Sequence, residues 1–373
     1  MSAAATIVLC IAAAFPAGGD LEAKLWRVRT ELDVFVPSGE HRDSGVKVAA
    51  PLSLAPQVPL AIAVTSDPPG EVKAWSIDAD GLVSVDLLPE IGEKHFTLVV
   101  VSDVLVSDGI GFDDTAPKTS LAKRAAPKGV EPWLRALPGA HTDDPEVVKA
   151  AATLAPKATD VLSLVRAIDE LCERRVRSAP TGAQEAGEAL RTGSGTELAR
   201  ARLRTALAIA HGVPARILAT SPITGGDELS FLGEFHAGEA GWLRFDALHR
   251  KAPAFPWPER ADLVFTVIDA DTPLAANSRP RPFFCRGGLT AGAKGGGSLF
   301  VCRELAKQAW SRAQVKQLLP LLVAANEDAK KGARGPYDRI EVLTTPRAMK
   351  SKPLAEWAAS FQAAIAAPPP DER

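Results

Sequence analysis

Two carboxylates, a serine and a histidine lie close together in the middle of this sequence. They are Glu197, Ser230, Asp246 and His249. A pair of carboxylates can act as general acid and general base in hydrolysis, and a neighbouring hydroxyl or imidazole can take part in the proton transfer. One hypothesis is therefore a hydrolase or acyl-transfer site built on Glu197 and Asp246, assisted by His249 or Ser230. Sequence spacing alone leaves open whether these side chains converge.

Cysteine chemistry is the second possibility that the residue types raise. A nucleophilic cysteine reacts as a thiolate, so it needs a helix N-terminus or a cation to lower its pKa, and a histidine nearby. Cys172 instead falls on the apolar stripe of a predicted helix, which indicates a core residue. Cys285 and Cys302 flank a glycine-rich stretch, which predicts a β-hairpin over 283–302 and leaves a disulfide between them open. No Cys-x-x-Cys pair or nearby histidine accompanies them, so we expect no metal site.

The segment 193–216 carries the most specific pattern in the chain. It is GSGTELARARLRTALAIAHGVPAR, and Gly-Trp-Leu-Arg-Phe-Asp follows at 241–246. The pattern resembles the centre of the bacterial transglutaminase-like domain, a relative of the papain-type thiol hydrolases. In that family the order is Gly-x-Cys-x-x-x-Ala-x-Leu-x-x-Ala-Leu, Gly-Ile-Pro-Ala-Arg, His-Ala-Trp-x-Glu and Gly-Trp-x-x-x-Asp. The resemblance covers 132–268 and implies an α+β domain with the papain-like fold.

This resemblance places a glutamate where the family has its nucleophilic cysteine. The match over 201–216 has no gap, so its register is fixed and the cysteine position falls on Glu197. Counting back from the Gly-Trp motif, the family glutamate falls on Glu234 and the family histidine on Ser230. The aspartate of the triad is kept, as Asp246. Because a catalytic triad acts as a unit, loss of its nucleophile and base abolishes the chemistry, and the resemblance implies an inactive domain.

An amphipathic helix is predicted to begin near Glu197. Ser194-Gly-Thr-Glu197 has the spacing of a capping box, in which the Ser194 and Glu197 side chains satisfy two free backbone N–H groups. A carboxylate at this end also stabilises the helix dipole, so Glu197 has a structural interpretation as well. Beyond the helix, Gly212-Val-Pro starts a strand that carries Arg216, for which we expect an ion pair with a carboxylate of the domain. The apolar face of the helix consists of Leu198, Ala201, Leu203, Ala206, Leu207 and Ala210.

The histidines around this helix have structural interpretations. His211 falls at the helix C-terminus, where a cation complements the helix dipole. His236 shares a strand face with Ser230 because side chains alternate along a strand. It lies six residues further on, about 20 Å in an extended strand, too far to serve the same site. We therefore expect His236 to be a surface or turn residue.

The composition is that of a globular protein without a strongly charged partner. A chain of 373 residues is long enough for two or three domains. Its net charge of −2 gives no basic surface for nucleic acid or anionic membranes. The first residues, MSAAATIVLCIAAAFPAGGD, form an apolar run too short to span a membrane, and the run resembles a secretory signal. We expect residues 1–18 to be a signal peptide and the protein to be periplasmic or secreted.

The rest of the sequence divides into a strand-rich part and a mixed part. Residues 22–112 are expected to form an antiparallel β-sandwich, because short runs with period-two alternation are separated by turn signals. A stretch at 113–130 rich in Lys, Pro and Ala is a predicted linker, and 131–272 is the transglutaminase-like domain. Residues 273–366 are predicted to form a small C-terminal α/β extension, followed by a disordered tail at 367–373. The alternating runs are 25–36, 46–49, 60–65, 82–87 and 96–101.

The family offers no guide beyond residue 272. Hydrophobic periodicity predicts a helix over 314–331, in which Pro320 would cause a kink or break. A short strand is expected at 340–343. A closing amphipathic helix is expected at 353–366.

The favoured interpretation of function is a catalytically inactive transglutaminase-like domain in an exported bacterial protein, with a binding or assembly role. Its vestigial cleft would hold an extended peptide or protein by main-chain pairing at a sheet edge. No cofactor is implied. The alternative is the rearranged enzyme site of Glu197 and Asp246. A third hypothesis places the function in the C-terminal extension, with the transglutaminase-like domain as a spacer.

Overall fold

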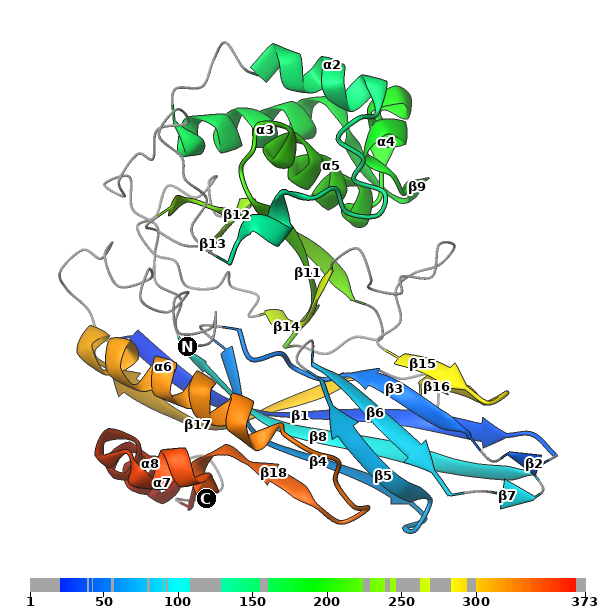
Figure 1. The fold of residues 1–373 in the computed structure, drawn as a ribbon, viewed down its shortest axis with the longest axis vertical. Coiled ribbons are helices and arrows are strands. Elements are labelled where there is room, and N and C mark those ends of the chain that lie inside the picture. Colours follow the sequence, from blue (N-terminus) through cyan, green and yellow to red (C-terminus); the bar gives the residue numbers. More distant parts are fainter. Residues whose placement is uncertain are drawn as a thin grey trace, which may run out of the picture.

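The longest strands of the computed structural model build one sheet of a β-sandwich, at the bottom of Figure 1. The structure describes residues 21–38, 40–41, 43–54, 57–78, 81–88, 90–91, 93–107, 129–154, 160–223, 229–238, 242–245, 262–268, 283–293 and 300–366. In this larger sheet all pairs are antiparallel, and β1 has β8 on one side and both β16 and β17 on the other. Its strands are β1 (Leu21–Val36), β8 (Lys94–Ser107), β4 (Gln57–Asp67), β18 (Arg339–Glu341), β16 (Thr290–Ala293) and β17 (Phe300–Trp310).

A smaller sheet packs against the larger one. It has four strands in the order β15 (Phe283–Arg286), β3 (Gly45–Ala49), β6 (Leu82–Leu87) and β5 (Val72–Ile77). A separate two-stranded ribbon joins β2 (Glu40–His41) to β7 (Glu90–Ile91). Alternate residues of β5 and β6 are buried, as the period-two pattern of the sequence indicates. The sandwich that the sequence predicts is therefore present, and every alternating run lies within a strand.

The C-terminal segment completes this sandwich. Strands β15 and β16 are joined through Gly287 and Gly288, whose φ angles of 71° and 77° suit a tight turn that crosses from one sheet to the other. The β-hairpin predicted over 283–302 is wrong, because β15 pairs with β3 and β17 pairs with β1. Cys285 and Cys302 therefore lie in different sheets, and both thiols are free.

Three helices of the same segment cover the sandwich. They are α6 (Arg312–Ala329), α7 (Pro346–Lys350) and α8 (Lys352–Ala366). Ser311 and Gln314 form a capping box at the start of α6. Of the kink or break expected at Pro320, the break does not occur, because the helix continues through this residue. On α8, the Trp357 ring meets that of Trp310 on β17 at a centroid distance of 5.7 Å. The helices predicted from periodicity thus form, and they pack on strands that lie far away in the sequence.

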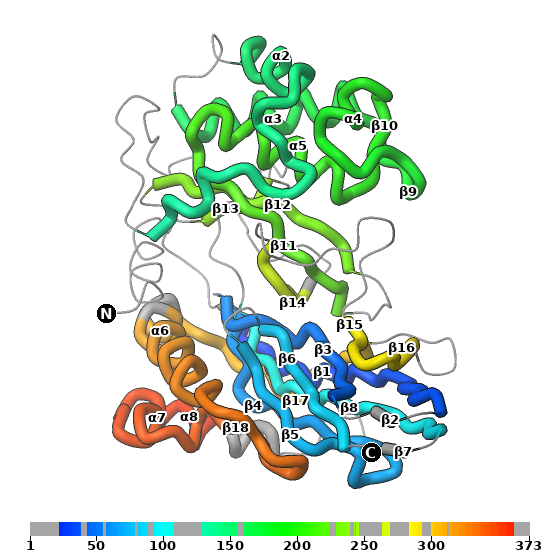
Figure 2. The backbone as a smooth tube through the Cα atoms, turned by 45° about the vertical axis from the view of Figure 1, so that its right-hand side comes forward, coloured from blue at the N-terminus to red at the C-terminus, as the bar shows by residue number. Residues whose placement is uncertain are grey.

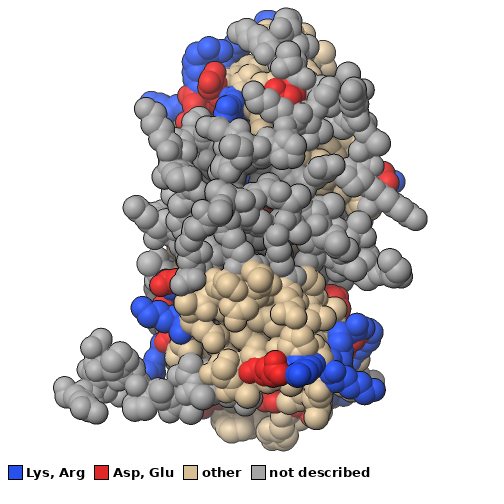
Figure 3. Space-filling view, turned by 90° about the vertical axis from the view of Figure 1, so that its left-hand side faces the viewer, with Lys and Arg blue, Asp and Glu red and all other residues tan. Residues whose placement is uncertain are grey.

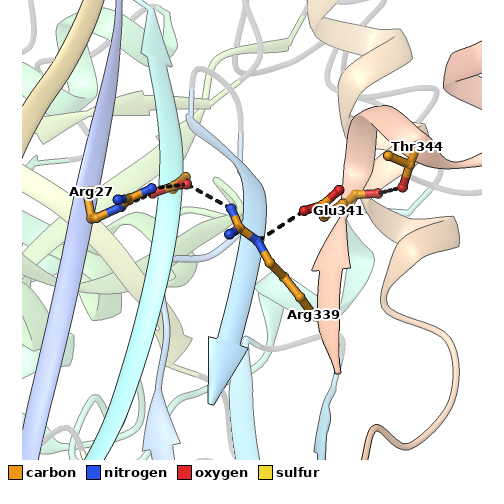
Figure 4. Close-up of polar contacts among 5 residues, drawn as sticks. Arg27, Arg339, Glu341 and Thr344 are labelled. Carbon is orange, nitrogen blue, oxygen red and sulfur yellow. Dashed lines mark hydrogen bonds and ion pairs between the residues drawn. The ribbon is translucent and has the colours of Figure 1, made fainter. Parts of the chain in front are cut away.

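A charged network also joins β18 to the centre of the larger sheet (Figure 4). The Asp103 carboxylate accepts hydrogen bonds from Arg27 Nε at 2.7 Å and Nη2 at 2.9 Å, and from Arg339 Nη2 at 3.2 Å. Arg339 Nε lies 3.3 Å from Glu341. The carboxylate of Asp103 is mostly buried, so two arginines from β1 and β18 compensate its charge.

The upper part of Figure 1 is a mixed unit that runs from the short 3₁₀ helix η3 (Glu131–Leu134) to β14. It is called here the papain-like domain, after the fold that the sequence resemblance predicts for it. Its antiparallel sheet has the order β13-β12-β11-β14, and the helices gather on one face of it. Figure 2 shows β14 as the strand of this sheet nearest the sandwich. The helices are α2 (Pro145–Leu154), α3 (Val161–Arg175), α4 (Ala186–Thr192) and α5 (Glu197–Ala210). The strands are β9 (Arg177–Ala183), β10 (Ser194–Gly195), β11 (Ala215–Pro222), β12 (Ser230–His236), β13 (Trp242–Arg244) and β14 (Asp262–Ile268).

The molecule is an α+β protein whose surface charges are mixed. On the described part of the face in Figure 3, Lys and Arg side chains lie beside Asp and Glu in small groups around a mostly uncharged surface. No helix among the described residues is long and apolar enough to cross a membrane. Residues 1–18, the predicted linker at 113–130 up to residue 128, and the tail at 367–373 lie outside the described residues.

Candidate active site

The start of α5 is the position at which the sequence resemblance places the thiol nucleophile of the family. Thr196 is the N-cap: its hydroxyl accepts a hydrogen bond from the Ala199 N–H at 3.2 Å. The Thr196 N–H itself donates to the Ala183 carbonyl at 2.9 Å, which ties the helix start to the end of β9. The predicted capping box is therefore wrong. Ser194 lies two residues before the N-cap, in β10, because the left-handed Gly193 ends α4 and the chain pairs with β9 before the helix begins.

Glu197 is the first residue of α5, as the sequence predicts, and its side chain is exposed. Among the described residues, none forms a hydrogen bond or an ion pair with its carboxylate. A carboxylate here stabilises the positive end of the helix dipole, as a thiolate would. It is a much weaker nucleophile toward an amide than a thiolate.

Ser230, the residue at the family's histidine position, is the first residue of β12. The chain leaves α5 at Gly212, whose φ of 68° reverses it, and β11 then runs back along the helix. Ser230 pairs with Thr220 at the end of β11. Since α5 packs on both β11 and β12, this pairing directs Ser230 toward the same end of the domain as Glu197. Asp246 and His249 lie outside the described residues, so the carboxylate pair remains a prediction.

Two motif residues form a buried ion pair on this sheet. Arg216 and Glu234 face each other in the register of β11 and β12. Arg216 Nε donates to Glu234 Oε2 at 2.8 Å, and Nη2 lies 2.7 Å from the same oxygen. The guanidinium also lies 4.1 Å from the centroid of the Trp242 ring, at the distance of a cation–π contact. The ion pair expected for Arg216 is confirmed, and it joins β11, β12 and β13.

His236 occupies a different environment from the one predicted. It is only 6% exposed at the end of β12, and its ring meets Trp242 edge-on at 5.3 Å. Burial and the nearby Arg216 charge lower the pKa of His236 to about 4, so the imidazole is neutral near pH 7. The expectation of a surface or turn residue is wrong, because Trp242 on the next strand covers the ring. Its distance from Ser230 along the strand agrees with the sequence argument.

The three described cysteines lie away from the start of α5. Cys172 is fully buried on α3, and burial raises the pKa of its thiol to about 12. Burial also raises the pKa of Cys285, and that of Cys302 to about 11. None of these three side chains is a thiolate near neutral pH. The core assignment of Cys172 is confirmed.

A charged cluster between α3 and α5 escaped the sequence analysis. Arg204 Nε donates to the fully buried Asp169 at 2.5 Å, and its Nη2 donates to Glu173 at 2.5 Å. Arg200 pairs with Glu173 as well. The signal was present in the sequence, since two acids and two arginines are each spaced four residues apart on facing helices. The cluster holds the two helices together. At the other end of α5, His211 Nε2 lies 3.1 Å from the Ala151 carbonyl oxygen, a structural contact.

Comparison with known proteins supports the fold. No family model matches the sequence, and no curated protein matches it. The crystal structure of a candidate cysteine protease from Cytophaga hutchinsonii superposes with a TM-score of 0.55 at 16% identity, covering 77% of this chain and 92% of that chain. The chain shares the fold of that structure, which agrees with the predicted papain-like α+β fold. Since residues 131–272 make up less than 77% of the chain, the likeness extends into the sandwich.

A second solved structure, a candidate protease from Parabacteroides distasonis, was also found. It covers 65% of this chain and 48% of that chain, at 14% identity and a TM-score of 0.26. A superposition this loose supports no conclusion about the fold or the site.

Proposed function

We propose that the papain-like domain of this chain performs no thiol acyl transfer and that it binds an extended peptide or protein segment. The observation that supports this most directly is the exposed Glu197 carboxylate at the first residue of α5. In thiol hydrolases a cysteine opens this helix, and the dipole stabilises its thiolate. The described cysteines have raised pKa values and lie on α3, β15 and β17.

The proposal also implies that the domain lacks the general base of a thiol hydrolase. Thiol acyl transfer needs an imidazole that holds the thiolate and later protonates the leaving group. Ser230 at the start of β12 cannot carry that proton at neutral pH. The described histidine on the same strand, His236, is buried at the other end and has a pKa of about 4. The nucleophile and the base would thus both be lost.

A binding role is supported by what the domain retains. The helix α5, the Arg216–Glu234 ion pair and the Trp242 contact are all present, so the domain keeps the structural elements that the motif specifies. Among the described residues, β13 pairs only with β12 and forms one edge of the sheet. An extended peptide can add to such an edge through main-chain hydrogen bonds.

The absence of thiol chemistry is tested by alkylation. The purified protein is incubated with dye-labelled casein, with and without prior treatment with iodoacetamide, and amide hydrolysis and cross-linking are measured. We expect iodoacetamide to leave hydrolysis and cross-linking unchanged, both in the wild type and in Glu197→Ala. Iodoacetamide-sensitive cleavage or cross-linking would overturn the proposal.

The binding role is tested with an extended polypeptide, fluorescein-labelled α-lactalbumin that has been reduced and carboxymethylated. Fluorescence anisotropy measures its affinity for the wild type and for Glu197→Arg. Because Glu197 is exposed, the variant is expected to fold and to change the affinity at least about fivefold, roughly 1 kcal/mol. The control is Glu356→Arg on α8, a glutamate whose side chain is 68% exposed on the sandwich. Equal affinities for the wild type and Glu197→Arg, or no binding at all, would count against a site at the start of α5.

The rival function is a hydrolase with a rearranged site that uses Glu197 and Asp246. The exposed carboxylate of Glu197, which no described residue pairs, favours it, since such a group is available as an acid or base. This enzyme would retain its activity after alkylation of every cysteine. Glu197→Gln and Asp246→Asn would each remove that activity.

We also propose that the protein is exported to the periplasm or secreted, with residues 1–18 as its signal peptide. The short apolar run and the small residues that follow it support this. Expression in a Gram-negative host, cell fractionation and N-terminal sequencing test the proposal. Recovery of the uncleaved chain in the cytoplasm would contradict it.

A further inference from the structure

A buried glutamine of the sandwich contacts the papain-like domain. Gln57 is the first residue of β4, and its side chain is completely buried. Its Nε2 donates to the Val264 carbonyl and to the Leu52 carbonyl, both at 2.8 Å. Its Oε1 accepts from the Val264 N–H at 3.0 Å. One side chain of the sandwich thus binds both main-chain groups of a residue on β14.

The main chain beside Gln57 adds to this contact. The Leu52 N–H donates to the Val264 carbonyl at 2.8 Å, so that oxygen accepts two hydrogen bonds from the sandwich. Val264 is paired with Thr220 of β11 on its other side. Gln57 and Leu52 therefore take the place that a further strand would occupy next to β14.

Apolar side chains surround these hydrogen bonds. Leu52, Leu218 and Val264 form a small buried cluster of their own, drawn from both parts of the chain. The rings of Phe265 on β14 and Phe300 on β17 meet with centroids 4.4 Å apart. Water is thus kept from the main-chain groups of Val264, and an unpaired N–H or C=O there would be costly.

We propose that the Gln57 contact fixes the orientation of the papain-like domain on the sandwich, so that the two unfold as one cooperative body. Gln57 is suited to this because its amide supplies both a donor and an acceptor in the spacing of a peptide unit. The contact also closes the β14 edge near Val264 to any added strand. A peptide that binds by strand addition must then use another edge. The inference holds whether or not the proposed peptide binding is correct.

The test compares two substitutions that each remove a hydrogen-bonded amide, buried at Gln57 and half-buried at Gln308. Gln57→Leu keeps the approximate volume but loses all three side-chain hydrogen bonds of the contact. The matched control is Gln308→Leu on β17, where the amide contacts Ser360, Trp310 and Trp357 within the sandwich. Differential scanning calorimetry records the number of unfolding transitions, and small-angle X-ray scattering records the maximum dimension.

We expect one transition for the wild type, a lower but still single transition for Gln308→Leu, and two separate transitions for Gln57→Leu with an increased maximum dimension. Two transitions in the wild type, or a single transition with unchanged scattering in Gln57→Leu, would overturn the proposal. If Gln57→Leu is insoluble, Gln57→Glu replaces it at pH 8, since a carboxylate keeps the acceptor but cannot donate to the two carbonyl groups. Two separate unfolding transitions are then expected for Gln57→Glu, and a single transition would again refute the proposal.

Discussion

At the scale of single residues, Thr196 and Glu197 have different roles although they are neighbours. Thr196 satisfies a main-chain N–H group and so fixes where α5 starts. Glu197 follows it with an exposed carboxylate, whose contribution to the helix is the long-range one of a charge near a dipole. Position 197 can therefore change its side chain without loss of the helix.

Substitutions at Thr196 and Ser194 test which of these two residues caps α5. Thr196→Ala removes the hydrogen bond to the Ala199 N–H and should lower the free energy of unfolding by about 1 kcal/mol. Ser194→Ala should change it by less than about 0.5 kcal/mol, since Ser194 lies before the helix. Urea denaturation followed by circular dichroism measures both. A larger loss for Ser194→Ala than for Thr196→Ala would restore the Ser194–Glu197 capping box.

His236 should make stability fall with acidification. Its pKa is about 4 in the folded protein and 6.5 as the ordinary value. The unfolded state thus binds a proton between these values that the folded state excludes, and the contribution of the neutral imidazole is lost as the pH falls from about 6.5 to 4. The expected loss is on the order of 2–3 kcal/mol. Urea midpoints at pH 7 and pH 5 measure it, and His236→Gln should show a smaller difference; an equal difference would place the pH dependence elsewhere.

At the scale of elements, local patterns predict what local forces decide. The predicted apolar face of α5 is buried from Leu198 to Leu207, whereas its last member, Ala210, is exposed. The helix is also buried beyond that face, at Ala199, Arg202, Thr205, Ala208 and Ile209. The ends of elements are less predictable. The start of α5 depends on β9, because Ser194 pairs with that strand and so cannot cap the helix. Pro320 is tolerated inside α6, a helix with a capping box at its start and a buried face on the sandwich.

Pairings between distant strands could not be predicted from the same patterns. The glycine-rich stretch after Cys285 suits a hairpin, yet Phe283–Arg286 pair with β3, whose residues lie far earlier in the chain. The candidate site shows the same limit. The motif indicated an ion pair for Arg216, but the burial of His236 depends on Trp242 from another strand.

At the scale of the whole molecule, the papain-like domain is an insertion in the β-sandwich. Strands β1 to β8 precede it and β15 to β18 follow it, and the later strands pair with β1, β3 and β4. The segment predicted as a C-terminal extension is thus part of the first domain. The chain enters and leaves the inserted domain from the same sandwich, and the Gln57 contact adds a non-covalent link between them.

This arrangement predicts the result of truncation at Pro273. Removal of 273–373 takes away β15 to β18 and the helices α6 to α8, so the long β1 loses its partner along Leu21–Thr30 and presents an unpaired edge. The buried Phe300, Trp310 and Phe361 are lost from the core as well. We expect aggregation on expression, or a soluble product without cooperative thermal unfolding, whereas deletion of 367–373 alone should leave unfolding unchanged. A soluble truncated protein with a single sharp transition would contradict this account. If it aggregates, a phenotype lost on truncation says nothing about where the function lies, because the sandwich is lost with the segment.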